Sequence, residues 1–339
     1  MSGSSSQNTL SFDGKVVIVT GAGGGLGRAH ALEFAERGAY VVVNDLGGTV
    51  DGKGGAPIAA QVVVDEINAK FGDGTAVANF DTVATQEGAA AIIATALETW
   101  SRVDVVVNNA GILRDHMITG VTDEDVDLII GTHLKGTLYV SQAAWRTMKT
   151  QGGGRIVNTT SAAGLFGNPG QSAYGAGKGG IYSITRALAA EGGMFGIAVN
   201  AIAPVGRTRM TEELFGELMD AFDPEFISPV VAWLAHDATP VTGEVYSCGG
   251  GHVARVAMLV GQGITLPDLS AEAIAANAET IRRLDNAFEP TNLTEEIEAT
   301  LKSLAPPETV EEARAGQGLG TLALDKDGSA DYADPVGAS

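Results

Sequence analysis

Residues 15–27 have the sequence KVVIVTGAGGGLG, and this stretch decides the fold. The apolar run at 16–19 is typical of a strand buried on both faces, and a helical pattern of apolar residues follows at 29–35. Glycines between a strand and a helix let the backbone approach a pyrophosphate, and the helix N-terminus offers it free N–H groups. The stretch therefore predicts a dinucleotide phosphate loop with contacts from Gly21, Gly25, Leu26 and Gly27.

A carboxylate follows where an adenosine ribose would lie. A second apolar strand, 40–44, ends at Asp45, eighteen residues after Gly27. An acidic residue at about that distance bonds ribose hydroxyls and repels a 2′-phosphate, so Asp45 favours NAD over NADP. Arg28 is the counter-argument, because an arginine near the loop can hold a 2′-phosphate. We favour the alternative for Arg28, a solvated helix residue.

Strand patterns alternate with helical stretches along most of the chain. This rhythm gives βαβ units, so we expect an α/β fold with a Rossmann-type, doubly wound parallel sheet. The expected strands lie near 15–20, 39–45, 75–80, 103–108, 154–160, 197–202 and 243–248.

Tyr174 and Lys178 are four residues apart, with Ser161 thirteen residues upstream. On a helix, positions i and i+4 share one face, so the phenol and the ammonium would point into the same cleft. A nearby cation lowers a tyrosine pKa, which makes the phenol a better base. Ser161 could then hold the substrate oxygen while Tyr174 moves the proton.

The order of the motifs resembles the short-chain dehydrogenase/reductase family. The motifs are the Thr-Gly-x-x-x-Gly-x-Gly loop, NNAG at 108–111, Ser161, the Tyr-x-x-x-Lys pair and NAIAP at 200–204. The resemblance implies one nicotinamide-binding catalytic domain with Ser-Tyr-Lys chemistry on a carbonyl/alcohol pair. It also implies cofactor contacts from Asp81, Asn109, Tyr174, Lys178, Gly206 and Thr208.

Five further segments resemble the dehydrogenase part of the peroxisomal multifunctional enzymes of type 2. They are VVVNDLGG at 41–48, AGILRD at 110–115, SAAGLFGN at 161–168, QSAY at 171–174 and RMT at 209–211. This resemblance implies NAD-dependent oxidation of a (3R)-3-hydroxyacyl-CoA. The alternatives are the same chemistry on another secondary alcohol, such as a 17β-hydroxysteroid, and a dinucleotide-binding regulator without catalysis.

His133 stands where the wider family has a catalytic asparagine, in the sequence HLKG at 133–136. The multifunctional-enzyme branch resembles this chain at that position as well. Two roles remain open for His133: a member of the proton relay behind Lys178, or a packing histidine on a helix.

The formal net charge is −20, which disfavours nucleic acid or an anionic membrane surface as a partner. An acyl-CoA is itself polyanionic, so its site needs local cations. Arg207 and Arg209 are candidates for substrate binding in the segment after Pro204.

Cys248 is the only cysteine, so no intrachain disulfide can form, and no Cys/His cluster has the spacing of metal ligands. We find no signal pattern at residues 1–8, no apolar run of membrane-spanning length and no C-terminal Ser-Lys-Leu address. These observations favour a cytoplasmic protein.

The expected organisation has four parts: a flexible N-terminus at 1–12, the NAD-binding catalytic domain at 13–250, a helical C-terminal extension at 251–305, and an acidic, poorly packed tail at 306–339. Helices are expected at 270–288 and 294–304. The resemblance further implies a homodimer or higher homo-oligomer, and a separate enoyl-CoA hydratase as a partner.

Overall fold

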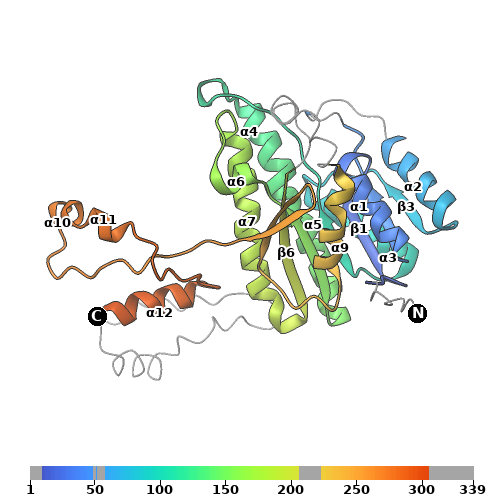
Figure 1. The fold of residues 1–339 in the computed structure, drawn as a ribbon. Helices are drawn as coiled ribbons and strands as arrows, with labels where there is room; N and C mark the ends of the chain where they lie inside the picture. Colours follow the sequence, from blue (N-terminus) through green and yellow to red (C-terminus); the bar gives the residue numbers. More distant parts are fainter. Residues whose placement is uncertain (1–9, 49–50, 52–57, 206–222, 305–339) are drawn as a thin grey trace, which may run out of the picture. The chain divides into compact units, whose positions relative to one another are not determined.

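The computed structural model describes residues 10–48, 51, 58–205 and 223–304 (Figure 1). The chain divides into two compact units, Met1–Val256 and Ala257–Ser339. Within the described ranges, every helix is too short or too polar to cross a bilayer.

The first unit is built on one eight-stranded sheet with the strand order β3-β2-β1-β4-β5-β6-β7-β8. The first seven strands are parallel and confirm the seven strands expected from the sequence. Their bounds are β1 Val16–Thr20, β2 Tyr40–Asn44, β3 Ala76–Asn79, β4 Val105–Asn108, β5 Gly154–Thr159, β6 Ile197–Pro204 and β7 Val245–Gly249.

The eighth strand, β8 (His252–Val256), was not predicted from the sequence. It pairs antiparallel with β7 at the edge of the sheet. Gly250 and Gly251, both at positive φ, form the two-residue turn between the strands, a conformation that glycine adopts without steric cost.

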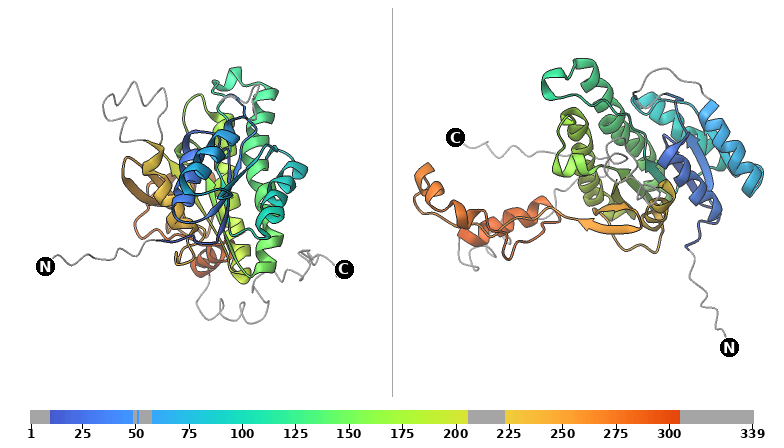
Figure 2. Two further views of the ribbon diagram at one scale, coloured as in Figure 1. Left: turned by 90° about the vertical axis from the view of Figure 1, so that its right-hand side faces the viewer. Right: turned by 45° about the horizontal axis from the view of Figure 1, so that its top comes forward.

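Helices cover both faces of the sheet, as Figures 1 and 2 show. α1 (Gly25–Glu36), α2 (Ile58–Phe71) and α9 (Ser228–Ala235) pack against one face, together with side chains such as Val17 and Val41. α3 (Gln86–Trp100), α5 (Gly136–Gln151) and α7 (Ser172–Gly192) pack against the other, with Val16 and Ile18. Successive residues of a strand point to opposite faces, so the continuous apolar strands supply both cores.

The shorter elements of this unit lie in the segments that connect the strands and the long helices. They are η1 Ile118–Gly120, α4 Asp123–Ile129, the π-helix η2 Ile130–Lys135, α6 Ala162–Phe166, η3 Gly193–Phe195 and η5 Pro224–Phe226. The sheet order reverses between β1 and β4, whose onward connections lead to opposite faces. Ligands of open α/β sheets bind at this kind of switch point, outside the carboxyl ends of the strands.

The second unit contains α10 (Ala271–Ala276), α11 (Ala278–Ile281) and α12 (Leu293–Leu304). The helix expected at 294–304 is confirmed, but the single helix expected at 270–288 is wrong. Asn277 takes a non-helical conformation (φ −109°, ψ 10°) between α10 and α11, and Asn286 is at positive φ, so the backbone cannot continue as one helix. Residues 257–304 contain no buried side chain.

Candidate active site

The glycine loop between β1 and α1 has the geometry of a phosphate cradle. A Cβ on Gly27 would overlap the carbonyl oxygen of Gly21 and lie 2.6 Å from Nδ2 of Asn109, so only glycine fits there. No side chain caps the first turn of α1, which leaves its amide groups available. A diphosphate fits a helix N-terminus of this kind, because the free N–H groups and the helix dipole both favour negative charge.

Asn109 ties this loop to the end of β4. Its Nδ2 donates to the carbonyl oxygens of Thr20, at 3.0 Å, and Gly21, at 3.1 Å. Its backbone N–H donates to Oγ1 of Thr20 at 3.1 Å. The polar groups of Asn109 therefore hold the shape of the loop. The sequence suggested only that Asn109 contacts the cofactor, and did not predict this structural role.

Asp45 follows β2 and faces the same loop. One carboxylate oxygen accepts from the backbone N–H of Gly23 at 2.8 Å, and the other accepts from Gly47 at 2.7 Å. The carboxylate is thus fixed beside the glycine loop, at the end of the adjacent strand.

Arg28 does not point at that carboxylate. It forms a two-pronged ion pair with Glu66 on α2, with Nε–Oε2 at 2.9 Å and Nη2–Oε1 at 2.5 Å. Both side chains are partly exposed. The guanidinium is therefore engaged away from Asp45, on the surface between α1 and α2.

Asp81 lies at the end of β3 in a network of side-chain amides. Its Oδ2 accepts from Nδ2 of Asn79 at 2.8 Å, and its carbonyl oxygen accepts from Nδ2 of Asn44 at 2.9 Å. Asn79 also bonds Thr95 on α3 at 2.9 Å. These bonds fix the position of Asp81 just beyond the carboxyl end of β3.

Ser161, Tyr174 and Lys178 are brought together by β5, α6 and α7. Ser161 caps α6, where its Oγ accepts from the N–H of Ala163 at 3.2 Å, and its hydroxyl lies near enough to the phenol of Tyr174 to lower the pKa of that phenol. Nζ of Lys178 lies 5.8 Å from the centre of the Tyr174 ring and donates to the carbonyl oxygen of Thr159 at 2.7 Å.

Close packing of α6 on α7 makes this arrangement possible. A Cβ on Gly164 would lie 2.6 Å from the backbone nitrogen of Gly179 and 2.7 Å from the carbonyl carbon of Lys178. Any larger residue at position 164 would push α6 away from α7, and Ser161 away from Tyr174.

The pKa of Tyr174 does not move in the direction that the sequence suggested. Burial raises it most, the hydrogen bond from Ser161 lowers it, and the charge of Asp115 raises it further. The net pKa is higher than usual. The expected depression by Lys178 is absent because that amine is itself desolvated and bonded to Thr159.

Lys178 is fully enclosed, and burial lowers its pKa to about 7. Burial disfavours the ammonium because it removes the charge from water, and no described carboxylate pairs with the amine to offset this cost. The amine can therefore gain or lose a proton near neutral pH.

His133 lies in the π-helix η2, at the junction of α4 and α5, and is buried. Its Nε2 is 2.8 Å from the carbonyl oxygen of Ile112 and 3.1 Å from the N–H of the same residue. Burial, and secondarily the charge of Lys178, lower the pKa of the imidazole to about 3. The imidazole is therefore neutral, and it connects the loop after β4 to the helix junction.

Two residues of that loop gained significance only from the structure. Arg114 donates to Asp125, at 3.0 Å, and to the carbonyl oxygen of Asp51, also at 3.0 Å. Hydrogen bonds from Thr122, and then from Arg114, lower the pKa of Asp125 to about 2. Asp115, the next residue, contacts Gln171 beside Tyr174. The segment AGILRD held both residues, but no spacing rule marked them.

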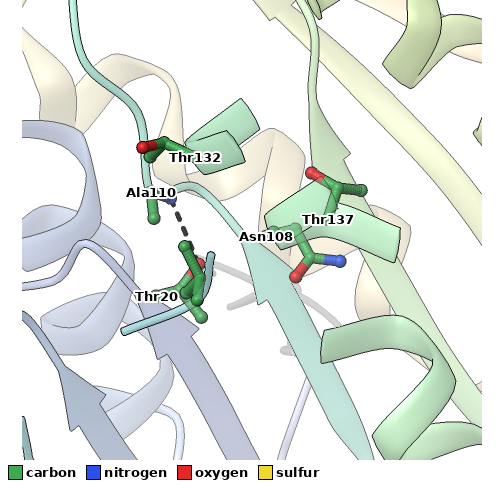
Figure 3. A pocket seen from close by; sticks show the side chains of 7 residues that line it. Thr20, Asn108, Ala110, Thr132 and Thr137 are labelled. Carbon is green, nitrogen blue, oxygen red and sulfur yellow. Dashed lines mark hydrogen bonds between the residues drawn. The ribbon is translucent and has the colours of Figure 1, made fainter. Parts of the chain in front are cut away.

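A small recess lies at the switch point. Figure 3 shows that its polar lining comes from the ends of β1 and β4 and from the η2–α5 junction. The labelled residues are Thr20, Asn108, Ala110, Thr132 and Thr137. Oγ1 of Thr20 accepts from the N–H of Ala110 at 3.1 Å, which fixes one wall.

Beneath the site, a chain of buried polar side chains links β4, β5, α5 and α7. Nδ2 of Asn108 donates to Ser141 at 3.0 Å and to Asn158 at 2.9 Å, and Nδ2 of Asn158 donates to Thr185 at 2.9 Å. Buried networks with satisfied partners rigidify their surroundings. This network fixes α7 against the sheet below Tyr174, and sequence reasoning missed it.

Gly206, Arg207, Thr208 and Arg209 lie outside the described residues. In the part of the chain that the structure covers, no group of three or more His, Cys, Asp or Glu side chains could hold a metal ion.

Comparison with known proteins places this geometry in a family. The family model described as short chain dehydrogenase matches residues 15–218. Peroxisomal multifunctional enzyme A of Dictyostelium discoideum is 44% identical over 296 residues, and peroxisomal multifunctional enzyme type 2 of Mus musculus is 46% identical over 291. These matches cover 87% and 84% of this chain, but the chain spans only 66% and 39% of those proteins.

A hydroxyacyl-CoA dehydrogenase of Mycobacterium tuberculosis is 39% identical over 267 residues, which are 74% of this chain and 81% of that protein. Among solved structures, a short chain dehydrogenase from Mycobacterium avium superposes with a TM-score of 0.70 at 45% identity, over 82% of this chain and 97% of that one.

A 7α-hydroxysteroid dehydrogenase complexed with NADH and 7-oxo glycochenodeoxycholic acid has a TM-score of 0.63 at 28% identity, over 71% of this chain and 95% of that one. The family model covers more than half of the chain, and the geometry above fits it. The chain belongs to the short-chain dehydrogenase family.

Proposed function

We propose that this protein is an NAD-dependent dehydrogenase that oxidises a (3R)-3-hydroxyacyl-CoA to the 3-oxoacyl-CoA. The observation that carries the chemistry is the placement of the Ser161 hydroxyl and of the enclosed Lys178 amine beside the phenol of Tyr174. The names of the multifunctional relatives and of the M. tuberculosis hydroxyacyl-CoA dehydrogenase support the substrate class.

Tyr174 removes the hydroxyl proton of the substrate, and Ser161 holds the same oxygen and stabilises its developing charge. Bound nicotinamide supplies the acceptor for the hydride from C3. Lys178 exchanges protons near neutral pH, and its desolvated amine is suited to hold the nicotinamide ribose. When it is protonated beside a bound cofactor, its charge favours the tyrosinate.

His133 acts in this scheme as a positioning residue. Its neutral ring fixes the loop at Ile112 and packs against Tyr174, with the ring centres 5.3 Å apart. The low pKa of the imidazole argues against a role as a charged relay group.

Two observations support NAD as the cofactor. Asp45 presents its carboxylate beside the glycine loop, where it would repel a 2′-phosphate. Arg28, which could have held such a phosphate, is paired with Glu66. The structural neighbour complexed with NADH is consistent with this proposal.

Several parts of the proposal rest on the sequence. Gly206 would contact the cofactor, Thr208 or Thr211 would reach the nicotinamide amide, and Arg207 and Arg209 would contact the CoA phosphates or the thioester end. The protein would act as a homodimer at least, with C2 symmetry as the default. An enoyl-CoA hydratase is proposed as a partner, on the resemblance to the multifunctional enzymes.

A panel of (3R)- and (3S)-3-hydroxyacyl-CoA thioesters of different chain lengths, together with 17β-hydroxysteroids and simple secondary alcohols, tests the proposal when it is assayed with NAD and NADP. We expect NAD reduction with the (3R) series alone. If only hydroxysteroids are oxidised, the proposed substrate class is wrong but the proposed roles of Ser161, Tyr174 and Lys178 stand. No turnover of any alcohol, together with tight NAD binding, would favour a non-catalytic dinucleotide-binding protein.

A further inference from the structure

Asp115 lies in the loop between β4 and η1 and is tied to the start of the catalytic helix. Nε2 of Gln171 donates to both of its carboxylate oxygens, at 3.1 and 3.0 Å. Gln171 is the N-cap of α7, three residues before Tyr174. A backbone bridge between His116 and Gln171 gives a second link. The carboxylate is therefore fixed beside the helix turn that carries the catalytic phenol.

The charge of Asp115 has no partner cation in the described part of the chain. Its neighbour Arg114 is directed to Asp125, at 3.0 Å, and Glu124, at 3.4 Å. His116 lies 3.7 Å from Asp125. Asp115 is exposed, and no described lysine or arginine forms an ion pair with it.

Tyr174 experiences this charge. After burial and the opposing bond from Ser161, Asp115 is the remaining cause of the raised phenol pKa. The other titratable groups around the phenol are His133, neutral and buried, and Lys178, enclosed behind the ring. Among the titratable groups around the Tyr174 phenol that the structure describes, Asp115 is therefore the one that carries a negative charge.

We propose that Asp115 determines specificity by excluding substrates that carry a carboxylate close to the reacting carbon, so that the site selects neutral thioesters or esters over free 3-hydroxy acids. This inference rests on the proposed function and adds a rule about the substrate class. It assigns Asp115 to recognition of the C1 group, whereas Ser161 and Tyr174 bind the C3 oxygen.

The chemistry of the two substrate classes explains the selection. In a free 3-hydroxy acid, the C1 carboxylate is two carbons from C3, so binding the hydroxyl at Tyr174 brings two like charges together. A thioester presents an uncharged carbonyl at C1, and the CoA phosphates lie at the far end of the pantetheine arm. Leu113 and Met117 of the same loop are apolar, so they offer no compensating cation.

The test compares (R)-3-hydroxybutyrate with its methyl ester at saturating NAD. The readout is the ratio of the two kcat/KM values, because any change in the pKa of Tyr174 affects both substrates alike. Wild type should favour the ester. Asp115→Asn, which keeps one acceptor for Gln171, should lower the preference by about threefold to tenfold, a modest factor for partly exposed like charges. The change in the ratio caused by Asp115→Asn should be smaller at 0.5 M salt, because salt screens the repulsion between the two carboxylates.

Two controls separate charge from structure. Asp115→Glu keeps the charge and should keep the wild-type ratio. Asp127→Asn removes an equal charge from the exposed surface of α4 and should not change it. An unchanged ratio in Asp115→Asn, or an equal change in both Asp115 variants, would overturn the proposal.

Binding gives a measurement that does not depend on turnover. With NADH bound to the Tyr174→Phe background, in which turnover is blocked, fluorescence can follow the affinities for 3-oxobutyrate and its methyl ester. Asp115→Asn should strengthen binding of the acid relative to the ester, and equal effects on both would overturn the role of Asp115. If the wild-type protein binds 3-oxobutyrate and its methyl ester but oxidises no 3-hydroxy compound, the proposed function is wrong. The ratio of the two affinities would still decide the role of Asp115.

Discussion

The imidazole of His133 meets the phenol of Tyr174 edge-on, with ring centres 5.3 Å apart and planes at 86°. The contact joins the π-helix η2 to α7, and the bond from His133 to Ile112 extends it to the loop after β4. Three segments that are distant in sequence therefore fix the direction of the phenol. Edge-to-face ring pairs of this kind are favourable because the positive edge of one ring faces the negative face of the other.

The first prediction concerns His133. His133→Ala should lower kcat roughly tenfold to a hundredfold, because a small misplacement of a catalytic group is costly. His133→Asn, which restores the residue of the wider family and can still bond the Ile112 backbone, should recover most of that loss. Steady-state kinetics over pH 5.5–9.5 check both variants.

The pH profile separates positioning from proton relay. The low pKa of His133 predicts that wild type and His133→Asn share the same profile. An ionisation near pH 6–7 in wild type that vanishes in His133→Asn would show that the imidazole titrates during turnover, contrary to this assignment.

The second prediction concerns the base. Tyr174→Phe keeps the ring that packs on His133 and removes only the hydroxyl. We expect kcat to fall at least about a hundredfold, within the usual range for general acid–base catalysis. NAD affinity, measured by calorimetry, should change little. Tyr182→Phe, two turns further along α7, is the matched control, and near-wild-type turnover in Tyr174→Phe would rule out the mechanism.

The third prediction concerns cofactor choice. Wild type should prefer NAD to NADP, and Asp45→Asn should reduce this preference. The asparagine keeps an oxygen that can accept the hydrogen bond from the backbone N–H of Gly23. Adding Glu66→Ala should reduce the preference for NAD further, because this change frees Arg28 from its ion pair and lets it approach a 2′-phosphate. The ratio of kcat/KM values for NAD and NADP measures the effect. A wild-type preference for NADP would overturn the role of Asp45.

Local pattern was sufficient to predict the central part of this fold. The apolar strands, the glycine loop and the i, i+4 spacing of Tyr174 and Lys178 are short-range features, and all seven expected strands are present. The missed strand β8 also had a signal, since Gly250 and Gly251 separate two strand-like segments.

What the sequence could not supply depends on contacts between distant segments. The burial of His30 depends on α9, almost 200 residues away, where Ser228 bonds its Nδ1 at 2.8 Å. Asp115 gains significance only because Gln171 and Tyr174 lie beside it. The direction of the Tyr174 pKa likewise depends on burial, which spacing alone does not reveal.

The fourth prediction concerns acid stability. His30 is buried, and desolvation lowers its pKa from 6.5 to about 3. Between those values the unfolded chain binds a proton that the folded chain does not, so stability falls as pH drops through this window. At pH 4.5 the contribution of His30 should be about 2–3 kcal/mol below its value at pH 7.

His30→Gln isolates this contribution from those of the carboxylates. The variant should be less stable than wild type at pH 7, yet it should lose less stability between pH 7 and pH 4.5. Urea unfolding at the two pH values measures the difference. Parallel losses in the two proteins would mean that His30 does not titrate on unfolding.

The fifth prediction concerns the effect of the buried Lys178 amine on the stability of the fold. Desolvation lowers the pKa of Lys178 from 10.5 to about 7, so between pH 7 and 10.5 the unfolded chain binds the extra proton. The contribution of Lys178 to stability is therefore unfavourable at pH 7 and improves as pH rises through this window. Lys178→Met should raise the free energy of unfolding at pH 7.5 by on the order of 1–3 kcal/mol, once the lost bond to Thr159 is subtracted.

Thermal unfolding at pH 7.5, 8.5 and 9.5, without cofactor, tests this expectation. The stability gain of Lys178→Met over wild type should shrink as pH rises, and NAD-dependent turnover should be lost at every pH. Lys70→Met replaces an exposed lysine on α2 and should show neither effect. A Lys178→Met variant less stable than wild type at pH 7.5 would mean that the contacts of the amine in the folded protein outweigh its loss of hydration.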